Sequence, residues 1–238
     1  MKRVLLLVVA NIIFLQLSAQ EVSRNKLFPF KSAVIEYQYT GNTTGSETFY
    51  VDDYGMKQCR VKNLSTKTFG MKTKESKIEI FKNFDIYTWD TGAKEGSVMR
   101  NIIAESIMKD KSLTDEQVTD GVTGSLGLKK TGKETVDGRL CNVWEGMNIK
   151  IWEWKGASLK SHSKIMGMTM DILAVSIKID QGVPAGIFDI PSDIKFTRID
   201  DPTADVDDAD GSDSAEGKAA QDSMMKSIKA GLKGIFKK

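Results

Sequence analysis

Chemically reactive side chains are scarce in this sequence of 238 residues, which contains one histidine and two cysteines. The GxSxG, HExxH and CxxC arrangements, which would supply a nucleophile, a metal pair or a redox pair, do not occur. The single histidine, His162, lies in a polar run after Gly156 and is expected to be an ordinary exposed residue. We therefore expect a non-catalytic protein that needs no metal and no cofactor. Two carboxylates facing across a cleft are a catalytic arrangement that no sequence spacing excludes.

An excess of either charge is also missing. Lys and Arg number 34 against 32 Asp and Glu, and Lys2 and Arg3 belong to an N-terminal segment that we expect to be removed. The mature chain is then neutral, which argues against nucleic acid as a partner.

No apolar run reaches the roughly 20 residues that a membrane-spanning helix needs. The longest, Val4 to Leu17, follows two basic residues and ends at Ser18-Ala19, which is the order of a secretory signal. We predict a signal peptide over residues 1–19 and a mature chain that begins at Gln20. No cysteine follows the apolar run, so we expect a soluble periplasmic or extracellular protein and not a lipoprotein.

The two cysteines, Cys59 and Cys141, both fall in predicted strands. Export to an oxidising compartment would permit a disulfide between them. The alternative is that each is a small buried hydrophobe in its own strand.

Hairpin patterns dominate the middle of the chain. Asp137-Gly138 is a dipeptide that two-residue type I′ turns prefer, so residues 129–136 and 139–145 are predicted to pair antiparallel. The following run, 148–155, places Ile149 and Ile151 on one face of a strand and Trp152 and Trp154 on the other.

These residues carry a family resemblance. The segments that carry it are GKETVDGRLCNVWE at 132–145, IWEWKGASLKS at 151–161 and FDIP at 188–191. They resemble exported β-proteins of uncharacterised function, common in Bacteroidetes-type bacteria, that are grouped with the LolA/LolB lipoprotein carriers. The resemblance implies a mainly β (α+β) domain over residues 20–199. Its implied fold is a curved, incompletely closed antiparallel barrel that encloses an apolar cavity beneath a helical lid.

The lid is predicted between Asn101 and Gly127, where apolar residues recur at helical spacing and Ser112 or Thr114 can cap a helix. Between Ile165 and Asp180 the apolar positions change from even to odd numbers. Such a change of phase predicts a bulge or bend near Ile172.

Beyond the domain, residues 200–217 are acidic and predict a disordered linker. Residues 218–238 then predict a basic amphipathic helix. This helix would either dock on its own barrel or contact a partner or an anionic membrane surface. The residues expected at that contact are Ile228, Leu232, Ile235, Phe236, Lys229 and Lys233.

Six residues are candidates for a ligand cavity: Trp144, Trp152, Trp154, Met166, Met168 and Met170. The tryptophans are either cavity lining or core, and the methionines are either a pliable cavity lining or a Cu(I) site. The leading hypothesis is an exported binding protein that holds a lipid or a lipidated protein. The alternatives are an envelope interaction or structural protein acting through its terminal helix, and a Cu(I)-binding protein acting through the three methionines.

Overall fold

A computed structural model describes residues 26–109 and 113–199 of the chain. Its elements are β1 (Ala33–Gly41), β2 (Thr43–Asp52), η1 (Asp53–Gly55), β3 (Lys57–Thr68), β4 (Met71–Lys82), β5 (Asp85–Asp90), β6 (Glu95–Arg100), α2 (Ile102–Lys109), α3 (Asp115–Ser125), β7 (Lys129–Val136), β8 (Arg139–Gly146), β9 (Ile149–Trp154), β10 (Ala157–Ile165), β11 (Met168–Ile179) and β12 (Lys195–Ile199). The described part of the chain is therefore mainly β, as predicted.

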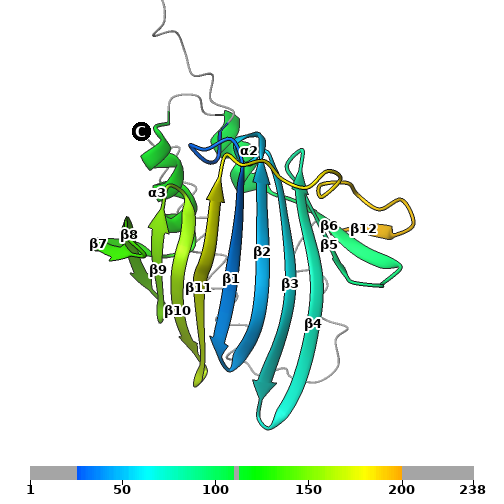
Figure 1. Cartoon of the computed structure of the whole chain (residues 1–238), viewed down its shortest axis with the longest axis horizontal. Helices are drawn as coiled ribbons and strands as arrows, with labels where there is room; N and C mark the ends of the chain where they lie inside the picture. Colours follow the sequence, from blue (N-terminus) through cyan, green and yellow to red (C-terminus); the bar gives the residue numbers. More distant parts are fainter. Residues whose placement is uncertain (1–25, 110–112, 200–238) are drawn as a thin grey trace, which may run out of the picture.

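All twelve strands form one sheet in the order β12-β6-β5-β4-β3-β2-β1-β11-β10-β9-β8-β7. The sheet is curved, and its end strands β7 and β12 do not pair with each other, so the barrel is incompletely closed (Figure 1). This architecture confirms the predicted fold. One detail differs, because β12 pairs parallel with β6 whereas the predicted barrel was antiparallel throughout.

The inner, concave face of the sheet carries most of the core. On β1 the alternate residues Ala33, Ile35, Tyr37 and Tyr39 are buried, and their register partners on β2 include Phe49 and Val51. Alternation of this kind is what a half-buried strand requires. The core continues across β11, where Ala174 is buried opposite Tyr37.

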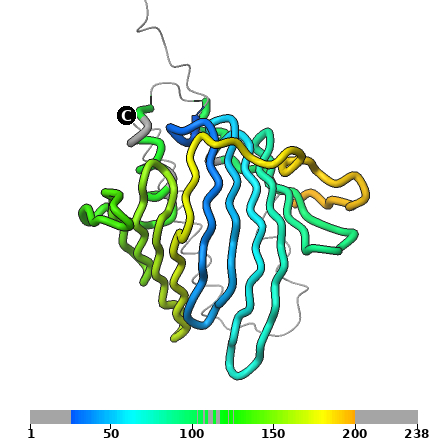
Figure 2. The backbone as a smooth tube through the Cα atoms, in the orientation of Figure 1, coloured from blue at the N-terminus to red at the C-terminus, as the bar shows by residue number. Residues whose placement is uncertain are grey.

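The outer face has a second, smaller core over β3 to β5, built from Cys59, Ile80 and Trp89. The segment after β11 crosses this face before it enters β12 (Figure 2). Apolar residues of that segment, among them Ile187 and Phe188, pack on the outer core together with Phe196 of β12. The crossing explains how β12 reaches the far edge of the sheet.

The predicted change of phase in β11 is confirmed, and its position is shifted. Ala174 lies opposite Tyr37 while Ser176 lies opposite Glu36, which leaves Val175 as the extra residue of a bulge. Before the bulge the even-numbered residues face inward, and after it Ile177 and Ile179 do. Val175 itself is exposed.

Helices α2 and α3 form the predicted lid. Thr114 caps α3, since its hydroxyl accepts a hydrogen bond from the Gln117 N–H and the Gln117 side chain accepts one from the Thr114 N–H. This reciprocal capping satisfies two N–H groups at the start of the helix.

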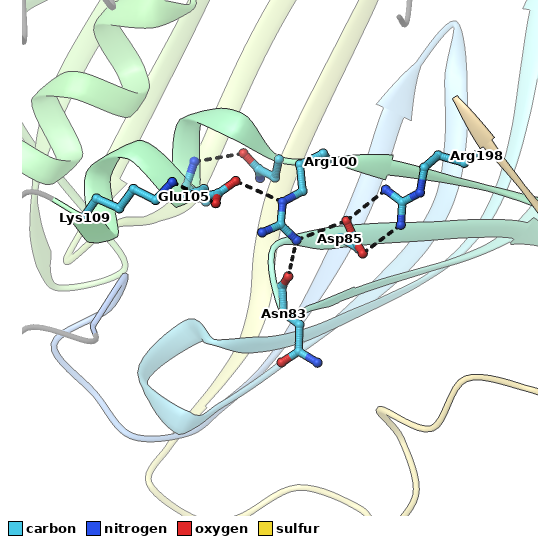
Figure 3. Close-up of polar contacts among 8 residues, drawn as sticks. Asn83, Asp85, Arg100, Glu105, Lys109 and Arg198 are labelled. Atoms are coloured by element: carbon cyan, nitrogen blue, oxygen red, sulfur yellow. Dashed lines mark hydrogen bonds and ion pairs between the residues drawn. The ribbon is translucent and has the colours of Figure 1, made fainter. Parts of the chain in front are cut away.

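A polar network anchors α2 to the sheet (Figure 3). Arg100, the last residue of β6, donates to Glu105 on α2 at 2.9 Å and to Asp85 on β5 at 3.3 Å. Arg198 on β12 binds the same Asp85 carboxylate at 3.1 Å. The hydrogen bond from Arg100, reinforced by Lys109, lowers the pKa of Glu105 to about 2.

Several predictions fall outside the described residues: the signal peptide at 1–19, the linker at 200–217 and the helix at 218–238 with its six contact residues. They stay predictions. None of the helices in residues 26–109 and 113–199 is both long and apolar enough to cross a membrane.

Candidate ligand-binding site

Three hollows lie on the inner face of the sheet, and two of them are also lined by residues of the lid. The first, the α3 hollow, measures about 400 Å³ and is lined by residues that include Val118, Asn142 and Glu153. The second, the lid hollow, measures about 310 Å³ and includes Ala104 and Arg60 in its lining. The third, the floor hollow, measures about 100 Å³ and lies deeper, against the strands. Phe28 lines all three, so the hollows meet at this residue.

Phe28 belongs to an N-terminal segment that runs beneath the lid. The N–H groups of Leu27 and Phe28 both donate to the carbonyl of Tyr54, at 2.8 and 3.0 Å. The Phe28 ring stacks on Phe30 with centroids 5.1 Å apart.

Two glycines make room for the Phe28 ring. A Cβ atom at Gly55 would lie 2.5 Å from the ring, and one at Gly156 would lie 3.1 Å from it. A side chain at Gly55 would therefore collide with the ring, and one at Gly156 would be tightly packed against it.

The floor of the site is polar. Glu47 is almost completely buried, with 2% of its side chain exposed, and it accepts hydrogen bonds from the Tyr39 hydroxyl at 2.5 Å and from Arg60. Arg60 is 37% exposed, and its guanidinium lies 3.8 Å from the centre of the Phe49 ring. Burial raises the pKa of Tyr37 to about 12, and burial together with the Glu47 charge raises that of Tyr39 further.

A second buried carboxylate lines the α3 hollow. Glu153 accepts hydrogen bonds from the Asn142 amide at 2.8 Å and from the Gly156 N–H at 2.5 Å. Because both carboxylates have partners, the inner face combines apolar walls with satisfied polar groups. An amphipathic molecule fits this lining better than a purely apolar one.

The structure does not bring the three predicted tryptophans to one cavity. Trp144 is in register with Ile151 and Trp152 with Val143, so the two indoles lie on opposite faces of their strands. Trp152 and Val143 belong to the main core cluster, and Trp144 does not. Trp152 donates to Glu134 at 2.6 Å and lies between Lys150 and Lys160, and Trp154 contacts Arg139 and Lys155. Of the hollows described, none is lined by a tryptophan. The core interpretation therefore applies to Trp144 and Trp152, which are buried.

The predicted methionine lining is likewise not gathered around a hollow. Met166 lies in the turn between β10 and β11 and is exposed, Met168 accepts a contact from Thr68 at 3.6 Å, and Met170 packs against the inner core. None of them lines a hollow among the described residues. Met166 differs from the other two because it belongs to the turn, whereas Met168 and Met170 belong to β11.

The candidate disulfide between Cys59 and Cys141 is not formed. Both thiols are free and buried, with Cys59 on β3 and Cys141 on β8, and five strands separate the two in the sheet. Neighbouring strands are about 4.8 Å apart, so the pair is far beyond the reach of a disulfide. The alternative, two buried small hydrophobes, is correct. Burial raises the pKa of Cys59 to about 11, which keeps the thiol protonated.

His162 lies on the outer face of β10, where its Nδ1 is 2.7 Å from an Asp171 carboxylate oxygen. Both side chains are partly exposed. This agrees with the expectation of an ordinary surface histidine.

Glu47 and Arg60 are the residues that sequence reasoning missed. Glu47 alternates with Phe49 and Val51, and all three share the inner face. The alternation of these three residues was therefore visible in the sequence. Arg60 gave no signal, because its position opposite Phe49 depends on the register of β2 and β3.

No family model matches the chain, and no curated protein matches it either. Among solved structures, the chain is similar to an uncharacterized conserved protein from Thermus thermophilus, with a TM-score of 0.46 and 8% identity over 72% of this chain and 92% of that one. It is also similar to LprF from Mycobacterium bovis, with a TM-score of 0.31 and 12% identity over 66% and 88% of the two chains. A lipoprotein-sorting protein domain from Vibrio parahaemolyticus has a TM-score of 0.20 and 10% identity over 66% and 88%. Scores this low carry no argument about function, so the site has to be judged by its own geometry.

Proposed function

We propose that the protein is an exported, non-catalytic carrier that binds a lipid or a lipidated chain between the lid and the inner face of the sheet. The observation that carries the proposal is the set of three hollows that meet at Phe28. Their walls supply apolar surface, and burial of an acyl chain there would contribute about 25 cal/mol per Å² removed from water.

The polar floor refines the proposal. Arg60 lines both the lid hollow and the floor hollow, and its hydrogen bond to Glu47 uses a single nitrogen of the guanidinium. The remaining N–H donors are suited to an oxygen-rich headgroup. A ligand with an acyl chain and a carboxylate, phosphate or ester end therefore suits the site, whereas a plain hydrocarbon leaves those donors unused.

A second candidate function is an envelope structural protein whose barrel is filled by its own side chains. The packing of Phe28 on Phe30, with its edge towards Phe49, favours this candidate because these rings occupy the space between the hollows. In that case the predicted helix at 218–238 would be the working part of the protein.

Native mass spectrometry of the full chain separates the two candidates. A carrier retains a bound lipid that disappears after unfolding, extraction and refolding, whereas a structural protein has the mass of the bare chain before and after. A dry chain that also fails to take up added palmitate would contradict the carrier.

A matched pair of variants tests the location of the ligand. Val118→Trp places an indole where the α3 hollow and the lid hollow meet, and we expect it to reduce palmitate binding by roughly tenfold or more. Leu140→Trp changes an exposed residue of β8 and should leave binding unchanged. Equal binding by both variants would place the ligand elsewhere.

A further inference from the structure

The hairpin turns at the end of the sheet away from the lid have an unusual composition. Three of them are two-residue turns whose first residue is large and apolar: Phe69, Met147 and Met166, with φ of +47°, +48° and +51°. Turns of this type prefer Asn, Asp or Gly at that position, because other residues are strained at positive φ. The two-residue turns at the opposite end follow the preference more closely, with Asn83, Asp137 and Lys155 in the same place.

The strained residues are also exposed to solvent. Phe69 is 90% exposed and Met166 is 68% exposed, and next to them lie Met71 at 70% and Ile165 at 50%. Together with Met147, these five residues make up the apolar rim. Isolated exposed apolar residues are normal on protein surfaces, but a group that gathers at one end indicates a contact surface.

Hydrogen bonds between turns show that the rim is continuous. The Asn42 N–H donates to Thr169 in the β10–β11 hairpin at 2.7 Å, and Lys67 in the β3–β4 hairpin donates to the Asn42 carbonyl at 2.9 Å. The Lys164 N–H donates to Asn148 in the β8–β9 turn at 3.0 Å. In Figure 1 the β3–β4 and β10–β11 hairpins project together from the end of the sheet opposite α2 and α3.

Positive charge flanks the β3–β4 and β10–β11 tips of the apolar rim. Four exposed lysines flank the turns, and no ion pair is found for any of them within the described residues: Lys67, Lys72, Lys74 and Lys164. The segments 64–74 and 161–170 contain no Asp or Glu. Lys67 and Lys72 even lie directly opposite each other in the β3–β4 ladder, where two like charges repel. An anion that approaches this end would relieve that repulsion.

We propose that the apolar rim and its lysines dock on an anionic lipid bilayer. The rim side chains would enter the boundary between headgroups and acyl chains, and the lysines would meet lipid phosphates. A bilayer fits better than a protein partner because the apolar residues are separate turn tips around an edge and form no groove. The proposal concerns a different surface from the lid hollows and does not depend on them.

Cosedimentation of the full chain with vesicles tests this docking. We expect binding to phosphatidylcholine vesicles that contain phosphatidylglycerol and much weaker binding to phosphatidylcholine alone. A variant with Phe69→Asn, Met71→Thr and Met166→Asn should lose binding by roughly tenfold or more, since it removes three inserting side chains. Replacing Lys67, Lys72 and Lys74 by Gln should cost roughly fivefold for each lysine that contacts the surface.

Two control variants make the result decisive. Leu140→Thr with Val175→Thr removes two exposed apolar residues of β8 and β11 that lie outside the rim, and this variant should bind like the unchanged chain. Leu232→Asp with Ile235→Asp alters the predicted terminal helix instead. The proposal is overturned if the rim variant binds as well as the outer-strand control, if the helix variant alone abolishes binding, or if both vesicle types bind equally. Palmitate binding in solution, measured on the same rim variant, should be unchanged, which separates this proposal from the carrier function.

Discussion

The two ends of the sheet use the same kind of turn and fill it differently. At the lid end, polar residues such as Asn83 and Asp137 take the first positive-φ position, and the turns at Gly55 and Gly156 close around Phe28. At the rim end, Phe69 and its counterparts take that position and point into solvent. The comparison indicates that stability was favoured at one end, while an exposed apolar surface was retained at the other at some cost in stability.

The greatest loss of stability is expected for a buried residue on the inner face, beneath the lid. Glu47→Leu leaves the Arg60 charge and the Tyr39 hydroxyl without their partner, so we expect the free energy of unfolding to fall by about 3 kcal/mol. Urea denaturation measures this loss. The matched control is Glu79→Leu, which removes a more exposed carboxylate from its pair with Lys62 and should cost about 1 kcal/mol or less. Similar losses for both variants would show that Glu47 has no special place in the interior.

A pair of glycine substitutions compares the two ends directly. Gly55 and Gly70 have φ of +92° and +85°, so alanine is strained at both, but only at Gly55 would the new Cβ meet the Phe28 ring. We expect Gly55→Ala to destabilise the protein by about 2 kcal/mol more than Gly70→Ala. Thermal unfolding of the two variants provides the comparison. If they are equally stable, Phe28 does not occupy the place assigned to it.

At the rim, one substitution should increase stability. Phe69→Asn puts a preferred residue into the β3–β4 turn, and we expect a gain of about 0.5–1 kcal/mol. At the other end Asp137→Asn exchanges one favourable turn residue for another and should change little. Urea denaturation of both variants checks the difference. A loss of stability in Phe69→Asn would mean that the phenylalanine supports the fold and is not reserved for contact.

The ion pair of Glu105 with Arg100, which anchors α2 to the sheet, should weaken gradually as the pH falls. The pKa of Glu105 is lowered from 4.5 to about 2, so its contribution to stability is fully present above about pH 4.5 and is lost as the pH falls towards 2. NMR titration of the Glu105 carboxyl group should give a midpoint near 2, and Arg100→Gln should return it towards 4.5. A midpoint unchanged by Arg100→Gln would exclude Arg100 as the cause. Segments 64–74 and 161–170 at the rim contain no carboxylates, so no carboxylate titration changes their charge over the same pH range.

The sequence predicted the features that depend on local patterns. Asp137-Gly138 predicted its hairpin, Thr114 predicted the helix cap, and the phase change in β11 predicted its bulge to within three residues. The extension of β3 and β4 to their tip was not predicted, because Phe69-Gly70 lacks the usual turn signal.

The candidate site depended on contacts that sequence spacing does not contain. Trp144 and Trp152 were candidates for one cavity or for the core, and the register of β8 with β9 places them on opposite faces. Phe28 reaches the interior through a segment without regular structure, so no periodicity marks it. Pairing between distant strands, and not local preference, decides which residues meet in the interior.

Photocrosslinking with a diazirine-labelled palmitate, followed by peptide mapping on the full chain, is the sharpest test of a ligand held beneath the lid. We predict adducts on the residues that line the hollows, such as Phe28, Val118 and Phe49. We also predict that unlabelled palmitate competes for them. Adducts confined to the rim or to the outer face of the sheet would contradict binding between the lid and the inner face. Adducts that unlabelled palmitate does not reduce would contradict it as well.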